Sequence, residues 1–229
     1  MRVDVAKPIY SITPFTLLDY PHKTACILWF AGCNMRCVYC YNPDIVDGEG
    51  ELSVSEAINF LKKRVNLIDA VVLSGGECTR FKGLIELAKE IKKIGMLVKI
   101  DTNGSNPDLI KEMIEQKLVD YVALDFKTLQ KNFFSVTGSK LHNRFVNTLD
   151  LLIEKSIAFE VRTTFHSELI GKQTILKMID FLSFKKYKGN YFIQNYRNDS
   201  ATLGGIKNSE YKFNIENPFQ NKIKIEIRN

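Results

Sequence analysis

The sequence lacks any long apolar run. Its 229 residues contain no stretch of about 18 consecutive apolar residues, which is roughly the length that a transmembrane helix requires. The first residues, Met1 to Lys7, also lack the apolar centre of a secretory signal peptide. We therefore expect a cytoplasmic protein without a membrane partner, in a compartment where thiols stay reduced.

The sequence also lacks the basic stripe, interleaved with aromatic residues, that is typical of nucleic-acid binding. Lysine and arginine exceed the acidic residues, which gives a net charge of +6. The lysines form short runs near the ends of expected helices, where the helix dipole favours positive charge. We expect no nucleic-acid partner, and an acidic protein such as a small electron carrier is the alternative use of this charge.

Strand-like and helix-like segments alternate along the chain. Strands are predicted at 25–30, 70–73, 96–101, 119–126, 158–165 and 190–195, and helices at 53–64, 81–94, 108–116, 143–155 and 171–184. This alternation predicts right-handed βαβ crossovers and a parallel sheet. Because six units are too few to close an eight-stranded barrel, we expect an α/β fold, a partial (β/α)6 TIM-like barrel with an open parallel sheet.

The length suits a single domain over residues 1–229. Residues 1–24 form a lead-in with an extra strand at 9–13, residues 25–200 form the core, and residues 201–229 form a C-terminal extension. Within this extension, residues 222–228 alternate isoleucine with charged residues, which is typical of an edge strand.

Polar residues in three of the expected strands share one face. Side chains alternate across a strand, and this parity places Asp101, Asp125, Lys127 and Arg162 on faces opposite apolar ones. A parallel strand that only packs should be apolar on both faces. The pattern therefore predicts a polar ligand cavity, with a buried salt-bridge network as the alternative.

Three of the five cysteines are crowded into one loop after the strand at 25–30. Cys33, Cys37 and Cys40 have the spacing C-x3-C-x2-C, at the end of the sheet where α/β proteins carry their sites. Most structural iron–sulfur clusters use four cysteines, so three thiolates suit a cubane with one iron left open. Zinc is the competing interpretation, but a structural zinc needs a fourth ligand, and no obvious second Cys/His pair follows.

A second motif closes the next strand. Gly75 and Gly76 allow a close approach of the backbone to a ligand, and Glu77 adds a carboxylate. Alone this triplet is a weak signal, because turns often contain such residues. Because the triplet stands at the end of the strand that follows the cysteine loop, it becomes a strong signal.

Together these motifs resemble the radical S-adenosylmethionine (SAM) superfamily. Within it, the chain resembles the activating proteins of glycyl-radical enzymes, in particular those of anaerobic ribonucleoside-triphosphate reductase. The matching segments are SITPFTLLDYPHK (11–23), CNMRCVYCYNP (33–43), LSGGECT (73–79), VKIDTNGSN (98–106), VDYVALDFK (119–127), VRTT (161–164) and IQNYR (193–197).

The resemblance implies that Cys33, Cys37 and Cys40 bind a 4Fe–4S cluster whose fourth iron is chelated by SAM. It places Tyr39 near the adenine. The other residues implied to surround the cofactor are Gly75, Gly76 and Glu77 at its amino group, Asp101, Thr102 and Asn103 near its methionine moiety, and Asp125, Lys127, Arg162 and Arg197 around it.

The resemblance also implies the reaction and the partners. An electron from flavodoxin or ferredoxin would cleave SAM to a 5′-deoxyadenosyl radical, which would take a hydrogen atom from a glycine of the partner enzyme. One position departs from the family, because Cys78 stands where a proline usually follows Gly-Gly-Glu. We expect Cys78 to be a packed small residue and Cys26 to be a core residue.

Three other functions remain open from the sequence. The chain could activate an enzyme like pyruvate formate-lyase, or it could modify a small molecule, as 7-carboxy-7-deazaguanine synthase does. From a different class, it could be a zinc-binding adaptor without catalysis. Iron with acid-labile sulfide, rather than zinc, would exclude the adaptor.

Overall fold

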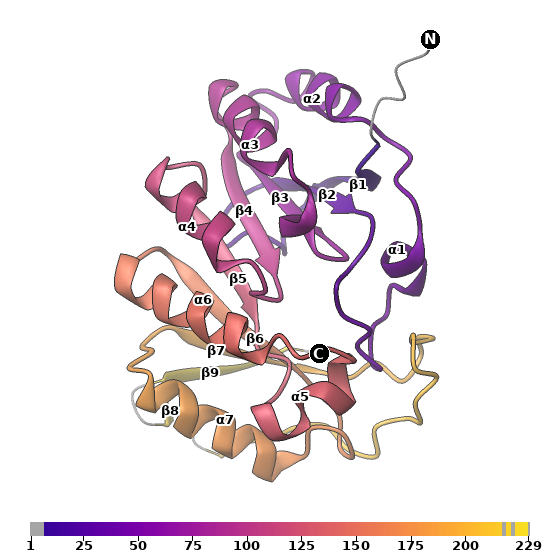
Figure 1. Ribbon diagram of the computed structural model, residues 1–229, viewed down its shortest axis with the longest axis vertical. Helices are drawn as coiled ribbons and strands as arrows, with labels where there is room; N and C mark the ends of the chain where they lie inside the picture. The colour runs from indigo at the N-terminus through magenta and orange to yellow at the C-terminus, as the bar shows by residue number, and fades with distance from the viewer. Residues whose placement is uncertain (1–6, 217–218, 221–222, 229) are drawn as a thin grey trace. The chain divides into compact units, whose positions relative to one another are not determined.

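The computed structural model describes residues 7–216, 219–220 and 223–228. In these ranges strands and helices alternate as predicted (Figure 1). The chain divides into two compact units. Unit 1 contains Asn42–Thr102, Asp108–Val122 and the described residues up to Asn34; unit 2 contains Met35–Tyr41, Asn103–Pro107 and the described residues from Ala123 onward. The expectation of a single domain stays a prediction.

Unit 1 is built on three parallel strands and one antiparallel strand. β2 (Ala25–Phe30), β3 (Ala70–Gly75) and β4 (Leu97–Thr102) are parallel, and β1 (Ile9–Thr16) runs antiparallel to β2. Nearly all side chains of β2 and β3 are buried, as expected for parallel strands that are covered on both faces. The predicted strand at 9–13 is thus confirmed as part of β1, and Cys26 is a core residue.

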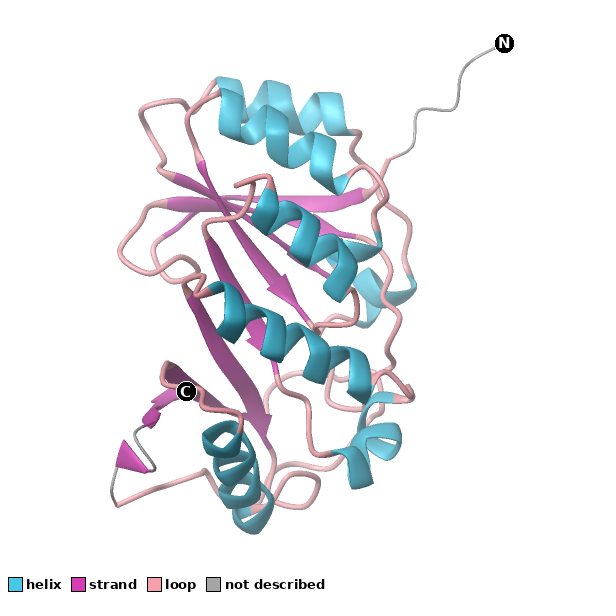
Figure 2. Ribbon diagram, turned by 60° about the vertical axis from the view of Figure 1, so that its left-hand side comes forward, coloured by secondary structure: helices cyan, strands magenta, loops and turns pink. Residues whose placement is uncertain are grey.

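The helices of unit 1 begin and end at the residues that favour helix termini. They are α1 (Pro43–Asp47), α2 (Val54–Lys62), α3 (Leu84–Lys93) and, from Asp108 onward, α4 (Pro107–Glu115), with a 3-10 turn η1 (Cys78–Arg80). α2 begins with a capping box, since Ser53 N–H donates to Glu56 and the Ser53 hydroxyl accepts from Glu56 N–H. Gly95 follows α3 with a φ of +83°. α2 and α3 lie side by side in both views (Figure 2).

Unit 2 continues the alternation from the last residues of β5 (Tyr121–Asp125). Its elements are α5 (Gln130–Thr137), α6 (His142–Lys155), β6 (Phe159–Phe165), α7 (Lys172–Phe184), β7 (Asn190–Asn195), β8 (Phe219–Gln220) and β9 (Ile223–Arg228). β6, β7 and β9 are parallel, and β8 pairs antiparallel with β9. The sequence pattern did not predict α1 or α5.

The prediction of an edge strand at 222–228 is wrong. β9 lies between β7 and β8 in the strand order, so β8 is the outer strand among the described residues. The alternation in β9 has another cause, because Ile223 and Ile225 are buried on one face while Lys224 is exposed on the other. Residue 222, which began the predicted strand, lies outside the described residues.

The predicted α/β class with an open parallel sheet is confirmed. The strand order is β1-β2-β3-β4 in unit 1 and β6-β7-β9-β8 in unit 2, with β5 divided between the units. Over the described ranges the order starts at β1 and ends at β8 without closing. No helix in the described part of the chain combines the length and the hydropathy needed to cross a bilayer.

Candidate active site

The cysteine triplet lies in the loop after β2. Cys33 is half-buried and belongs to unit 1, whereas the buried Cys37 and the half-buried Cys40 belong to unit 2. In unit 2, Cys40 N–H donates a hydrogen bond of 2.9 Å to the Cys37 carbonyl. These two cysteines therefore stand at the two ends of one turn.

A shared single-metal site is absent from the described residues. In these ranges, no three His, Cys, Asp or Glu side chains are grouped to hold one ion. A cubane requires a different arrangement, because each thiolate binds an iron of its own. The assignment of the three cysteines as cluster ligands stays a prediction.

The two glycines at the end of β3, Gly75 and Gly76, approach the backbone of the segment that leads into the cysteine loop. Gly75 has a φ of +120°, and a Cβ added to Gly76 would lie 2.2 Å from the Gly32 carbonyl oxygen. Gly76 N–H donates to Phe30 O (2.9 Å), and Glu77 N–H donates to Gly32 O (3.0 Å). Only glycine fits a contact this close. Within unit 1, the glycines thus make a close approach to the chain's own cysteine loop, and the approach to a ligand that was inferred from the sequence stays a prediction.

The Glu77 carboxylate is held from within unit 1. Its side chain is buried, and its Oε1 accepts hydrogen bonds from Thr79 N–H (3.2 Å), Thr79 Oγ1 (2.6 Å) and Thr102 Oγ1 (2.7 Å). A buried carboxylate requires such donors to replace its lost hydration. The threonines therefore fix the rotamer of Glu77 at the end of β3. Its predicted contact with the cofactor amino group is not tested.

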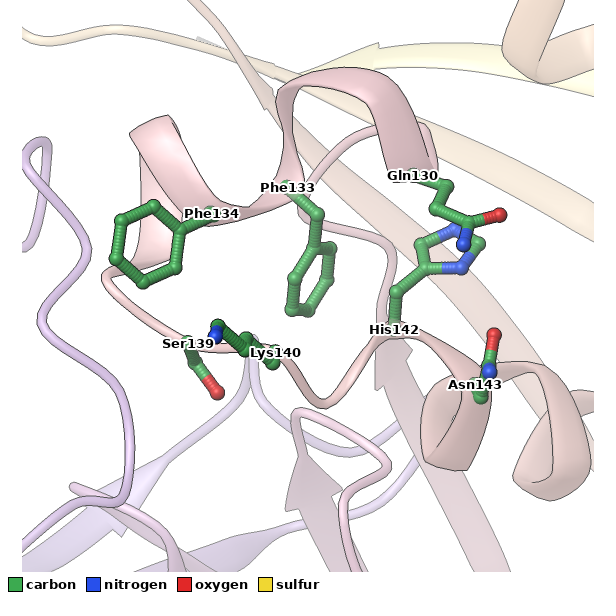
Figure 3. Close-up of a pocket in the computed structure, with 7 residues that line it drawn as sticks. All are labelled: Gln130, Phe133, Phe134, Ser139, Lys140, His142 and Asn143. Carbon is green, nitrogen blue, oxygen red and sulfur yellow. The ribbon is translucent and has the colours of Figure 1, made fainter.

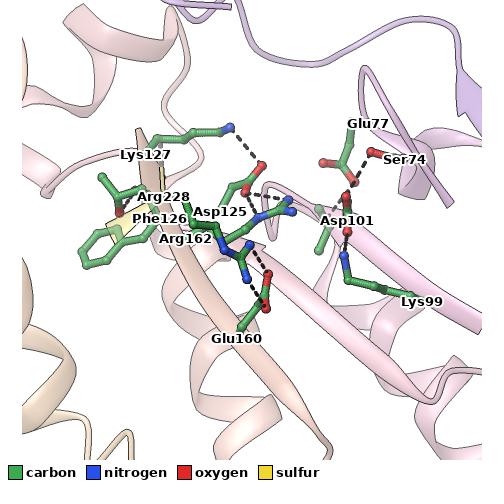
Figure 4. Close-up of polar contacts among 12 residues, drawn as sticks. Ser74, Glu77, Lys99, Asp101, Asp125, Phe126, Lys127, Glu160, Arg162 and Arg228 are labelled. Carbon is green, nitrogen blue, oxygen red and sulfur yellow. Dashed lines mark hydrogen bonds and ion pairs between the residues drawn. The ribbon is translucent and has the colours of Figure 1, made fainter. Parts of the chain in front are cut away.

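Asp101 is the second acidic residue of this part of unit 1. Its Oδ1 accepts from the buried Lys99 ammonium at 2.6 Å, and its Oδ2 accepts from the Ser74 hydroxyl at 3.2 Å (Figure 4). The Cys78 thiol lies 3.6 Å from the Asp101 carbonyl oxygen. Burial raises the pKa of Cys78 well above its usual range. The expectation that Cys78 is a packed small residue is confirmed, because it has no exposed surface.

The Asp-x-Lys segment of unit 2 forms a network of two cations and one carboxylate. Asp125 Oδ1 accepts from Arg162 at 3.0 Å, and Asp125 Oδ2 accepts from the Lys127 ammonium at 3.1 Å (Figure 4). Burial by itself raises the pKa of Asp125, but the charges of Arg162 and Lys127 outweigh it, and this pKa is lowered. The polar face predicted from strand parity is thus present, and its residues form the ion pairs that were the alternative interpretation.

Tyr39 lies beside this network. The Lys127 ammonium is 6.0 Å from the centre of the Tyr39 ring, and the ring is almost completely buried. Burial raises the pKa of the Tyr39 phenol. In the described part of the chain, no group forms a hydrogen bond with the Tyr39 hydroxyl. A buried tyrosine hydroxyl usually has a partner.

Two further predicted residues have local roles in unit 2. Asn103 is buried, and its side-chain oxygen accepts from Ser105 N–H at 2.9 Å, which closes the turn after β4. Arg197 is exposed, and its guanidinium lies 4.7 Å from the centre of the Tyr41 ring. Tyr41 in turn accepts the Arg197 N–H and packs against Tyr196. The sequence analysis did not single out Tyr41 or Tyr196.

Comparison with known protein families identifies the family of this chain. The model of the radical SAM superfamily matches residues 27–182. This chain belongs to the radical SAM superfamily. The matched range includes the whole cysteine loop and the Gly-Gly-Glu turn.

Two curated proteins illustrate the relationship of this radical SAM chain. A Methanocaldococcus jannaschii protein, named as a glycyl-radical enzyme activating enzyme, is 35% identical over 73% of this chain and 72% of its own length. The pyruvate formate-lyase-activating enzyme of Clostridium pasteurianum is 33% identical over 57% of each chain. Unlike the first, the second match leaves over a third of each protein unaligned.

Solved structures show the fold. SuiB of Streptococcus suis, bound to its precursor peptide SuiA, matches with a TM-score of 0.64 and 19% identity, over 81% of this chain and 41% of SuiB. The structure of native anSMEcpe with bound AdoMet matches with a TM-score of 0.58 and 20% identity, over 73% of this chain and 49% of the other chain. The chain thus spans less than half of these structures. The radical SAM fold, a partial barrel, is therefore confirmed.

The family supplies the cofactors, a 4Fe–4S cluster and SAM. The residues of this chain fit them: three cysteines lie in one loop, and glycines bring the Gly-Gly-Glu turn against that loop in unit 1. In unit 2, the buried Tyr39 hydroxyl that lacks a partner in the described part of the chain is also compatible with a bound group. The individual contacts of the cofactor residues stay predictions.

A hollow in unit 2 contains none of the predicted site residues. It measures about 180 Å³ and is lined by Gln130, Phe133, Phe134, Ser139, Lys140, His142 and Asn143 (Figure 3). The His142 ring packs edge-on against Phe133 and lies near Phe145. Burial lowers the pKa of His142. These contacts are those of a histidine that packs among aromatic rings.

Proposed function

We propose that this radical SAM enzyme generates a glycyl radical on a partner enzyme, and that the partner is an anaerobic ribonucleoside-triphosphate reductase. The 35% identity, over 73% of the chain, with a protein named for glycyl-radical enzyme activation carries the activase function. The choice of the reductase as partner rests on the segments that resemble its activating proteins, among them SITPFTLLDYPHK (11–23) and CNMRCVYCYNP (33–43). When bound and supplied with an electron, the cluster and SAM would supply the radical chemistry needed to remove a hydrogen atom from a glycine.

The residues of the chain would bind and orient these groups. Cys33, Cys37 and Cys40 would hold the cluster. Gly75 and Gly76 would bring main-chain groups to the amino end of SAM. Other contacts are proposed for Tyr39, Glu77, Asp101, Thr102, Asn103, Asp125, Lys127, Arg162 and Arg197. Because Thr79 and Thr102 fix the Glu77 carboxylate, it would need no reorganisation when a cation binds.

A small acidic electron carrier, flavodoxin or ferredoxin, would supply the electron. Lys62 and Lys63 are exposed at the end of α2, and positive charge of this kind steers acidic proteins toward a surface. The rate of reduction should therefore fall as ionic strength rises.

A pyruvate formate-lyase-like partner is the second candidate. It is favoured by the 33% identity with the enzyme of Clostridium pasteurianum that activates pyruvate formate-lyase. The two candidates share one chemistry and differ in the protein that presents the glycine, so a direct comparison of partners separates them.

The test is radical formation on a defined partner. The anaerobically reconstituted protein is reduced with dithionite, supplied with SAM, and mixed with an anaerobic ribonucleoside-triphosphate reductase or with a pyruvate formate-lyase. We expect a glycyl radical by electron paramagnetic resonance on the reductase, together with stoichiometric 5′-deoxyadenosine. Radical formation on pyruvate formate-lyase alone would overturn the choice of partner.

A matched pair of cysteine variants controls the test. Cys37→Ala removes a proposed cluster ligand, whereas Cys26→Ala removes a cysteine from the core of unit 1. We expect Cys37→Ala to abolish both the radical and 5′-deoxyadenosine, and Cys26→Ala to retain both. If SAM is cleaved but neither partner acquires a radical, the activase function is wrong while the family chemistry stands.

A further inference from the structure

The segment after β7 crosses back over the cysteine loop within unit 2. This segment, residues 198–213, is here called the strap; it contains turns but neither helix nor strand. Hydrogen bonds of the Asn198 side chain close the strap on itself, since it donates to Ser209 O (3.0 Å) and accepts from Ser209 N–H (2.8 Å). Two bonds attach the strap to neighbouring segments: Ser167 N–H donates to Ser209 Oγ (3.0 Å), and Phe213 N–H donates to Asn195 Oδ1 (2.7 Å). Phe213 is also buried against Phe165.

The middle of the strap is hydrogen-bonded to the part of the loop that carries two cysteines. Leu203 N–H donates to the Cys40 carbonyl and Gly204 N–H donates to the Val38 carbonyl, each at 2.9 Å. Both contacts are between main-chain groups. They join residues that are more than 160 positions apart in sequence.

The other side of the same loop is held by the end of α5. Arg36 N–H donates to Thr137 O (2.7 Å), and Val38 N–H donates to Val136 O (3.0 Å). The last carbonyls of a helix have no partner within the helix, so the loop supplies donors that α5 itself lacks. Val38, between Cys37 and Cys40, is therefore fixed through its N–H by α5 and through its carbonyl by the strap.

One residue of the strap, Gly204, lies so close to the cysteine loop that a side chain does not fit there. A Cβ added to Gly204 would lie 2.8 Å from both the Val38 carbonyl oxygen and the Val38 Cβ. Neither neighbour is the end of a flexible side chain, so a substitution would push the strap and the loop apart. Gly205 differs, because a Cβ there would meet nothing within 4 Å, although its φ is +55°.

We propose that the strap is a positioning element for the iron–sulfur cluster, which clamps the turn between Cys37 and Cys40 and sets how long the cluster is retained. Release of iron requires the turn to open, and opening breaks the hydrogen bonds from Leu203 and Gly204. Losing one ordinary hydrogen bond changes an equilibrium by about fivefold. The proposal rests on the family's cluster and is independent of the partner enzyme.

The test measures cluster retention in Gly204→Ala against Gly205→Asn. Each variant adds a side chain at one of two adjacent glycines of the strap, but only the side chain at position 204 meets the cysteine loop. Asparagine is used at position 205 because it tolerates the positive φ there. The reconstituted full-length proteins are placed anaerobically with a ferrous-iron chelator, and iron release is followed by absorbance. We expect Gly204→Ala to release iron at least about fivefold faster than the parent, and Gly205→Asn to match the parent.

A spectroscopic readout separates positioning from general stability. The electron paramagnetic resonance spectrum of the reduced cluster should change in Gly204→Ala and not in Gly205→Asn, while both metal-free proteins melt near the parent temperature. Parental iron release and an unchanged spectrum in Gly204→Ala would overturn the proposal, and so would equal losses in both variants. If Gly204→Ala does not fold, Asn198→Ala, which removes the side-chain hydrogen bonds that close the strap on itself at Ser209, is expected to accelerate iron loss, and parental retention there would overturn the proposal.

Discussion

Glu77 in unit 1 is buried and Asp125 in unit 2 is half-buried. Both carboxylates lie in segments that resemble the radical SAM family, yet different kinds of groups hold them in place. Glu77 accepts hydrogen bonds from the hydroxyls and amide of Thr79 and Thr102. Asp125 accepts from two cations, Lys127 and Arg162. Neutral donors fix a carboxylate without cancelling its charge, whereas cations also balance it. The two carboxylates thus differ in the kind of donor that the described contacts give them: hydroxyls and an amide at Glu77, and two charged side chains at Asp125.

The largest effect is expected from breaking the unit 2 network. Asp125→Ala leaves Lys127 and Arg162 without this shared carboxylate, and should lower the free energy of unfolding by about 3 kcal/mol. Urea unfolding of the metal-free protein measures it. The control is Glu86→Ala, which removes the partner of Lys89 in an exposed pair and should cost under about 0.5 kcal/mol. Equal losses in the two variants would show that the network contributes no more than a surface pair.

The pH dependence of the free energy of unfolding tests the same ion pairs of Asp125. Because the charges of Arg162 and Lys127 outweigh burial and lower the pKa of Asp125, its ionised form stabilises the fold above the unfolded-state pKa of about 3.9. That contribution is lost as the pH falls through the lower folded-state pKa. The stability difference between the parent and Asp125→Asn should therefore be constant above about pH 5 and shrink below about pH 4. A difference that grows in acid would contradict the assignment.

An intermediate loss of stability is expected when a hydrogen bond to Glu77 is removed. Thr102→Val removes one hydroxyl donor from the buried carboxylate and should lower the free energy of unfolding by about 2 kcal/mol. Thr148→Val is the matched control, since the Thr148 hydroxyl donates to a neutral carbonyl, that of Gly104, at 2.7 Å; it should cost about 1 kcal/mol. The reverse order, measured by urea unfolding, would mean that the charge on Glu77 does not strengthen its hydrogen bonds.

The smallest effect is expected at Cys78. Cys78→Ala removes a buried sulfur and should cost roughly 1 kcal/mol, with the iron content after reconstitution equal to that of the parent. Cys33→Ala should instead lose the cluster. Loss of iron from Cys78→Ala would identify a fourth cysteine ligand and remove the open iron on which the cofactor assignment depends.

The sequence was sufficient for features that depend on residue type and spacing. The cysteine triplet, the Gly-Gly-Glu turn, the capping box at Ser53 and the polar face of Asp125 and Arg162 all follow from local patterns. It failed at residues 222–228, because alternation shows that one face of a strand is covered but not which strands lie beside it. It also missed α5, whose sequence, QKNFFSVT, combines β-branched and aromatic residues that are weak helix formers.

By itself, the sequence determined the family and the alternating α/β fold, and it predicts which residues bind a cluster and SAM. Only the tertiary structure decided how those residues are supported: that Gly76 packs on Gly32, that threonines hold Glu77, and that the strap joins Val38 and Cys40. These contacts are made largely by main-chain groups and hydroxyls from distant segments. Main-chain hydrogen bonds are available to nearly every residue, so the sequence carries little record of which ones form.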